Sequence, residues 1–132
     1  MTAMKIGAVT VGQAPRTDVT ADILPLLDKV EVKGMCHITG GGLLENLPRV
    51  YAKNLAAEIE AASWQRPAVF DLIQRLGNIE AAEMYRVFNM GIGYVVIVAA
   101  EDAAAVQQQC PDALVIGRMI ERTGDMPGVI IK

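Results

Sequence analysis

The stretch HITGGGLLENLPR, residues 37–49, decides the local fold, because an apolar strand ends there at three successive glycines. Such glycines let the backbone turn tightly and bring several N–H groups to a ligand with no side chain in the way. Residues 43–51 predict a short helix that is irregular at Pro48. Its positive end would face the glycines, which suits a phosphate or a carboxylate.

Two side chains beside the glycines add to this prediction. Thr39 offers a hydroxyl donor and Arg49 a counter-charge. The candidate phosphate- or substrate-binding residues of this stretch are Thr39, Gly40, Gly41, Gly42, Asn46 and Arg49. The loop lacks the Gly-Lys-Ser/Thr ending of a P-loop and the spacing of GxGxxG. A strand-to-helix turn that holds no ligand explains the same glycines, and the residues alone leave both interpretations open.

A second glycine-containing motif, FNMGIG, occupies residues 88–93 and precedes a buried strand. Its glycines either line a cleft or merely relieve crowding, and Asn89 and Gly91 join the candidate binding residues. Trp64 lies in a predicted loop before Pro67, where we expect it to close the core.

Strands and helices alternate along the whole chain. The class is therefore α/β (α+β), with a mixed β-sheet flanked by helices. The predicted strands are residues 5–12, 32–38, 55–59, 94–99, 114–120 and 128–131. The predicted helices are residues 18–29, 43–51, 67–76, 78–88 and 101–109, with a loop at 13–17.

Three details of the helices are also predicted. Pro25 is tolerable only in the first turn or two of its helix. The helix after Pro67 buries a stripe made of Val69, Phe70, Ile73 and Leu76. Asn78 caps the start of the next helix.

Length, composition and charge limit the classes of protein to which this chain can belong. A chain of 132 residues, 52% hydrophobic and 20% charged, has room for one domain with one core. The net charge of −3 argues against nucleic acid or an anionic membrane as partner. No apolar run reaches the roughly 20 residues that cross a bilayer, and no cleavable leader is evident, so a cytoplasmic protein is expected.

Few residues suit catalysis or metal binding. Cys36 and Cys110 are far apart, no CxxC occurs and His37 is the only imidazole, so we expect buried reduced thiols and no metal site. No nucleophile is evidently paired with His37, and no catalytic residue is assigned. Glu45, Glu80 and Glu83 lie on predicted helices, and the sequence does not show whether any two converge.

From about residue 26 to 132 the chain resembles the C-terminal domain of the aminoimidazole ribonucleotide (AIR) synthetase family, the phosphoribosylformylglycinamidine cyclo-ligases of purine biosynthesis. The matching blocks, in the family's order and spacing, are VKGM (32–35), residues 37–49, SWQ (63–65), PAVF (67–70), GNI (77–79), EMYR (83–86) and FNMGIG (88–93). Val87 and Tyr94 are minor departures.

The resemblance implies that ATP and Mg²⁺ are bound mainly by a preceding N-terminal domain, so no cofactor is expected in this chain. Alone, the chain should be an incomplete and inactive piece that at most binds a phosphorylated small molecule. The face that the absent domain would cover is expected to be apolar and to favour a homo-oligomer. The alternative is a recombined or engineered chimeric folding unit with no ligand.

The segment 1–25 resembles instead the start of the AroM family, related to aspartate/glutamate racemases, over VTVGQAPRTDVT (9–20). A single domain would thus join an AroM-like strand–loop–helix (1–25) to the AIR synthetase-like part (26–132). A racemase of that superfamily needs paired acid–base cysteines, and Cys36 and Cys110 lie outside the AroM-like segment, so this function is disfavoured.

Overall fold

The computed structural model describes residues 4–9 and 16–132. It contains one six-stranded sheet in the order β2-β4-β1-β5-β3-β6. The strands are β1 (Met4–Val9), β2 (Gly34–His37), β3 (Leu55–Ile59), β4 (Tyr94–Ala99), β5 (Ala113–Glu121) and β6 (Val129–Ile131). All neighbours are antiparallel except β3 and β6, which are parallel. The prediction of a mixed sheet flanked by helices is confirmed.

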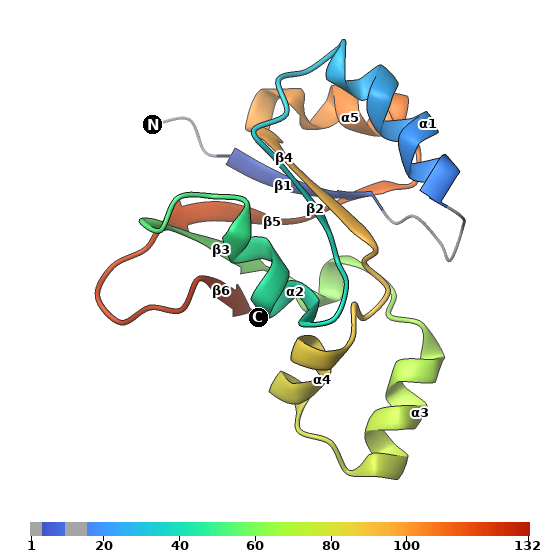
Figure 1. The fold of residues 1–132 in the computed structure, drawn as a ribbon, viewed down its shortest axis with the longest axis vertical. Helices are drawn as coiled ribbons and strands as arrows, with labels where there is room; N and C mark the ends of the chain where they lie inside the picture. Colours follow the sequence, from blue (N-terminus) through green and yellow to red (C-terminus); the bar gives the residue numbers. More distant parts are fainter. Residues whose placement is uncertain (1–3, 10–15) are drawn as a thin grey trace.

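Five α-helices and three short 3₁₀ turns connect the strands within the described residues. The helices are α1 (Arg16–Leu27), α2 (Gly42–Asn46), α3 (Ala68–Gly77), α4 (Ala81–Val87) and α5 (Ala103–Gln109). The 3₁₀ turns are Leu47–Arg49, Ala61–Ser63 and Ala100–Asp102. Figure 1 shows α1 and α5 together beside β1 and β4, whereas α3 and α4 lie at the opposite end of the molecule. None of the helices described combines the length and hydropathy needed to cross a bilayer.

The apolar run of β4 serves both faces of the sheet, because successive side chains of a strand point to opposite faces. Val95 and Ile97 pack into the larger core cluster, with α2 and α4. Val96 and Val98 pack into the smaller cluster, with α1 and α5. Strand β4 therefore has four consecutive buried residues, which explains why its sequence reads as an unbroken β-branched run.

The two cysteines lie in different clusters. Cys36 belongs to the larger cluster and Cys110 to the smaller one, and both are buried. They lie in separate cores and are not bonded to each other, which confirms the expected buried thiols. Burial raises the pKa of the Cys36 thiol, while the charge of Arg49 opposes that rise. A thiol with a raised pKa is a poor nucleophile at neutral pH.

The positions of Pro25 and Asn78 in the helices differ from prediction. Pro25 lies near the end of α1 rather than in its first turns, so it removes only one late backbone hydrogen bond. Asn78 ends α3 in a left-handed conformation (φ 49°), and Glu80 is the residue that precedes α4. Asparagine suits both positions, because its side chain favours N-caps and its backbone tolerates positive φ.

The predicted buried stripe of α3 is wrong in part. Phe70 and Ile73 pack against the larger cluster, but Val69 and Leu76 are 52% and 76% exposed. The apolar residues of α3 form one broad face, and only the side of it that carries Phe70 and Ile73 meets the core.

Candidate functional site

The triple-glycine loop leaves β2 and enters α2 through two residues with positive φ. Gly41 has φ 101° and Gly42 has φ 59°, in the region where a Cβ is strained. At Gly42 a Cβ would also lie 2.0 Å from the carbonyl oxygen of Tyr85 and 2.7 Å from that of Phe88. Gly40 has open space around it. Gly42 therefore relieves crowding against the end of α4, and Gly41 permits the turn.

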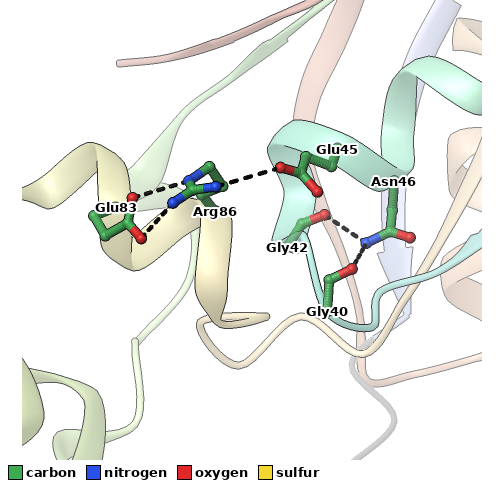
Figure 2. A network of polar contacts seen from close by, with 6 residues as sticks. All are labelled: Gly40, Gly42, Glu45, Asn46, Glu83 and Arg86. Atoms are coloured by element: carbon green, nitrogen blue, oxygen red, sulfur yellow. Dashed lines mark hydrogen bonds and ion pairs between the residues drawn. The ribbon is translucent and has the colours of Figure 1, made fainter.

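The buried side chain of Asn46 organises this loop from inside. Its Nδ2 donates to the carbonyl oxygens of Gly42 at 2.8 Å and of Thr39 and Gly40 at 3.2 Å each. Figure 2 shows the amide pointing between Gly40 and Gly42. The Thr39 hydroxyl lies 3.4 Å from Asn46 Oδ1, a long hydrogen bond. The amide group of Asn46, which is only 4% exposed, thus shapes the loop.

The orientation of these carbonyls fixes the orientation of the amides that follow them. In a planar trans peptide the C=O and the next N–H point in opposite directions. Since the carbonyls of Thr39 and Gly40 point toward Asn46, the N–H groups of Gly40 and Gly41 point away from it. Thr39 and Gly40 are exposed, so these amides lie at the surface of the domain.

A line of charges borders the same loop. Arg86 on α4 donates from Nε and Nη2 to the two carboxylate oxygens of Glu83 at 2.9 and 2.6 Å. Its Nη1 lies 3.8 Å from Oε1 of Glu45 on α2. Figure 2 shows Arg86 between the two carboxylates. Two of the three glutamates whose convergence was open therefore meet at one arginine. The Arg86 hydrogen bonds hold the pKa of Glu83 below its usual value.

The Glu45 side chain also approaches the glycines, since a Cβ on Gly41 would lie 2.6 Å from Oε2 of Glu45. A carboxylate at this position disfavours a second anion unless a cation balances it. Arg86 is the cation that the fold places there. This residue was not among the predicted site residues, because its proximity to the loop depends on the packing of α4 against α2.

The loop formed by Asn89, Met90 and Gly91 follows α4 directly. Asn89 Oδ1 accepts from the Gly91 N–H at 2.9 Å, and Trp64 Nε1 donates to the Met90 carbonyl at 3.0 Å. Gly91 has φ 96°, and a Cβ there would lie 2.6 Å from Cδ of Pro67. Gly91 therefore relieves crowding, and Trp64, 7% exposed, closes the core as predicted.

The structure joins the two predicted motifs through α4. Gly42 packs on the carbonyls of Tyr85 and Phe88, one residue before Asn89. Arg49 is exposed at the end of the 3₁₀ turn after α2, where its charge acts on Cys36 of β2. His37 is exposed, and its ring stacks on Tyr94 with centroids 6.3 Å apart.

A hollow of about 550 Å³ is lined in part by Pro67 and Tyr85, the two residues against which Gly91 and Gly42 pack. Its lining includes Trp64, Gln65, Tyr85 and the Arg66–Asp71 ion pair, in which the nitrogen and oxygen are 2.9 Å apart. Within the described part of the chain, no three His, Cys, Asp or Glu side chains gather in a way that could hold a metal ion.

Comparison with known proteins shows which family, relatives and solved structures this chain resembles. A family described as "AIR synthase related protein, C-terminal domain" matches residues 2–128. The match includes residues 2–25 of the segment 1–25, and no comparison supports the AroM-like resemblance of that segment. Residues 13–15 of the predicted AroM-like loop lie outside the described residues.

Curated relatives carry one printed name, phosphoribosylformylglycinamidine cyclo-ligase. That of Neisseria meningitidis serogroup B (strain MC58) is 51% identical over 116 residues, covering 85% of this chain and 34% of the relative. That of Thermoanaerobacter pseudethanolicus is 45% identical over 119 residues, covering 87% and 34%. The chain thus spans about a third of the length of the curated relatives it matches.

Solved structures share the fold at low identity. The match to a chain of a HypE–HypF complex covers 99% of this chain and 50% of that chain, with a TM-score of 0.67 and 15% identity. HypE of E. coli, a hydrogenase maturation protein, covers 99% and 46%, with a TM-score of 0.65 and 21% identity. Thiamine-monophosphate kinase from Stenotrophomonas maltophilia K279a covers 99% and 50%, with a TM-score of 0.58 and 16% identity.

Proposed function

The chain belongs to the AIR synthase related protein, C-terminal domain family, and from this premise we propose that it is the C-terminal-domain part of a phosphoribosylformylglycinamidine cyclo-ligase. The proposal rests on the identity to enzymes of that printed name, which is 51% over 116 residues for one relative and 56% over 94 residues for another. The chain corresponds to about a third of such an enzyme, and we propose that these 132 residues alone do not catalyse its reaction. ATP and Mg²⁺ would be bound mainly by the part of the enzyme that this chain does not cover.

The role we assign to this part is to bind a phosphorylated small molecule at the triple-glycine loop. The observation that carries the assignment is the Asn46 side chain, which holds the carbonyls of Thr39 and Gly40 inward. The following amides, those of Gly40 and Gly41, therefore point outward as a pair of donors, with the Glu45 carboxylate beside Gly41. Thr39 could add a hydroxyl, and Gly42, Asn46, Arg49, Asn89 and Gly91 remain candidates around it.

Arg86 supports this assignment electrostatically. With Glu45 beside Gly41, the loop alone would repel a phosphate, and Arg86 lies where its charge offsets that of Glu45. When a phosphate binds, we expect Arg86 to turn from Glu45 toward the new anion while it keeps its hydrogen bonds to Glu83. The affinity of an exposed site of this kind should be low, because water screens its charges.

Titration of the isotope-labelled chain with inorganic phosphate and with ribose 5-phosphate tests the binding proposal. The expected result is a set of backbone amide shifts confined to residues 40–43 and to Arg86. Arg75→Ala, on a different surface, is the matched control for Arg86→Ala, and only the latter should weaken binding. If no amide shifts, the alternative of a recombined folding unit without a ligand is favoured instead.

A separate assay tests the proposed lack of activity. The purified chain is supplied with ATP, Mg²⁺ and formylglycinamidine ribonucleotide, and formation of the imidazole product is followed. We expect no turnover above the rate without protein. Turnover by the chain alone would refute the claim that catalysis needs the remaining two thirds of the enzyme.

A further inference from the structure

The hollow of about 550 Å³ beside the start of α3 contains hydrogen-bond donors that no protein group uses. Its lining includes Tyr85 of α4 and the run of residues from Trp64 to Ala68 that leads into α3. None of the described residues that line it belongs to the triple-glycine loop. The hollow is therefore a second place for a ligand, separate from the loop to which the proposed function assigns a phosphate.

The hydroxyl of Tyr85 is the first of these donors. Tyr85 packs in the larger core cluster and is only 9% exposed, yet it lines the hollow. Its hydroxyl makes no hydrogen bond within the described part of the chain. No side-chain nitrogen or oxygen of the described residues is both buried and unpartnered, so this hydroxyl reaches solvent, and it does so where Tyr85 lines the hollow. Polar groups of buried residues normally have a partner, and one that ends unpaired in a hollow points to a ligand.

The first turn of α3 supplies two further donors. Pro67 stands at the N-cap of this ten-residue helix, and no side chain caps it. The Phe70 N–H bonds to the Pro67 carbonyl at 3.1 Å, whereas those of Ala68 and Val69 have no partner among the described residues. These two N–H groups point back along the helix toward the hollow, which Ala68 lines, and they carry the positive end of the helix dipole.

Arg66 determines the sign of charge that the hollow accepts. Its Nη2 lies 2.9 Å from Oδ1 of Asp71, the one ion pair that Arg66 makes with a described residue. Nε and Nη1 can therefore still donate to a ligand. The charges of Arg66 and Asp71 balance each other, so the positive end of α3 favours a single negative charge in the hollow.

Apolar groups form the remaining wall of the hollow. Trp64 donates its only N–H to the Met90 carbonyl at 3.0 Å, so the part of its ring that lines the hollow is apolar. Ala61 and Pro67 extend this apolar surface. A few donors beside an apolar wall are typical of sites for small organic molecules.

We propose that this hollow binds a small organic carboxylate. The carboxylate would accept hydrogen bonds from the N–H groups of Ala68 and Val69 and from the Tyr85 hydroxyl. Arg66 would supply the counter-charge, and the apolar part of the ligand would lie on Trp64. A planar group with one charge suits adjacent amides and a guanidinium, whereas Asp71 would repel a phosphate dianion more strongly.

Titration of the full chain with benzoate tests the proposal, and Trp64 is a probe within the site because it is the only tryptophan. We expect a saturable change in its fluorescence at millimolar benzoate, since the hollow is open and the ligand small. Amide shifts should centre on Ala68 and Val69 and not on residues 40–43. Failure of phosphate to bind at residues 40–43 would therefore leave this result unaffected.

Benzamide is the matched control ligand, because it keeps the ring of benzoate and lacks the charge. It should bind at least about tenfold more weakly than benzoate. Equal binding of the two compounds would refute a carboxylate site. Benzoate that shifts neither Ala68 nor Val69 would overturn the proposal altogether.

Two variants test the groups assigned to the carboxylate. Tyr85→Phe keeps the ring in the core and should weaken benzoate binding by about three- to tenfold, while Tyr94→Phe, outside the hollow, should not. Arg66→Gln should weaken binding by about tenfold, and Arg75→Gln, on the exposed surface of the same helix, should not. Circular dichroism checks the fold of each variant. A folded Tyr85→Phe chain that binds benzoate as tightly as the unmodified chain overturns the proposal.

Discussion

The Cα of Gly42 faces the main chain of Tyr85 so closely that a Cβ would lie 2.0 Å from the Tyr85 carbonyl oxygen. This contact joins the triple-glycine loop to α4, and with it the first predicted motif to the second. It also makes the three glycines inequivalent. Gly42 is required by packing and by its φ of 59°, whereas Gly40 has open space around it.

Gly42→Ala should destabilise the domain by about 3 kcal/mol or more, since positive-φ strain and overpacking each cost roughly 1–3 kcal/mol. Gly40→Ala is the matched control, and it should change the free energy of unfolding by less than about 1 kcal/mol. Urea unfolding followed by circular dichroism measures both. Equal effects of the two substitutions would contradict the packing seen at Gly42.

Asn46→Ala should destabilise the domain by about 2–4 kcal/mol, because the carbonyls of Gly42, Thr39 and Gly40 each lose the hydrogen bond from the Asn46 amide. Thr39→Ala removes only one long contact at an exposed residue and should cost less than about 1 kcal/mol. Hydrogen exchange of the loop amides adds a local readout. We expect faster exchange in Asn46→Ala, and unchanged rates would mean that Asn46 does not organise the loop.

Glu58 makes the stability of the sheet sensitive to acid. Hydrogen bonds from Lys132 at 2.8 Å and Arg118 at 2.9 Å hold the pKa of Glu58 below its usual value. A carboxyl with a lowered native pKa stabilises the fold above its unfolded pKa, and this contribution is lost as the pH falls through the native value. Chemical unfolding at neutral pH and at about pH 3 should therefore show a smaller acid-induced loss in Glu58→Gln.

The control for that experiment is Glu60→Gln, on the residue that follows β3. Glu60 is exposed, and we expect its variant to lose as much stability in acid as the unmodified chain. A Glu58→Gln variant that keeps the full acid-induced loss would assign the acid sensitivity to other carboxylates.

Tyr51 makes the stability of the domain sensitive to alkaline pH. Burial raises the pKa of Tyr51 to about 12, with smaller opposing effects from a hydrogen bond and from Arg122. Its hydroxyl lies 2.6 Å from the Gly128 carbonyl oxygen. A raised native pKa gives stability that is complete below the unfolded pKa of about 10 and is lost as the pH rises toward the native value. Tyr51→Phe should be less stable at neutral pH, yet lose less between about pH 9 and pH 11.5.

Local patterns predicted the elements of this fold well where one signal dominated. The β-branched run at 94–99 became β4 with the predicted bounds, because a strand buried on both faces needs apolar residues throughout. Asn78 was assigned to the wrong helix end, because asparagine is favoured at both. Val69 and Leu76 were predicted to be buried because helical periodicity identifies an apolar face but does not reveal what covers it.

The sequence predicted only those features of the site that depend on backbone conformation. Gly41 and Gly42 do take the positive-φ conformations that three successive glycines suggest. The internal role of Asn46 and the meeting of Glu45 with Arg86 follow from tertiary packing, for which single residues give no signal. Whether the candidate residues bind a phosphate stays a prediction that titration can test.

The position of β1 has a consequence for how the chain is made. This first strand, Met4–Val9, lies between β4 and β5 and pairs with residues 94–99 and 113–118. During synthesis on the ribosome β1 therefore has no partner strand in this sheet until β4 and β5 have been made. Pairing over such long sequence distances predicts that the domain folds slowly and that β1 joins the sheet late.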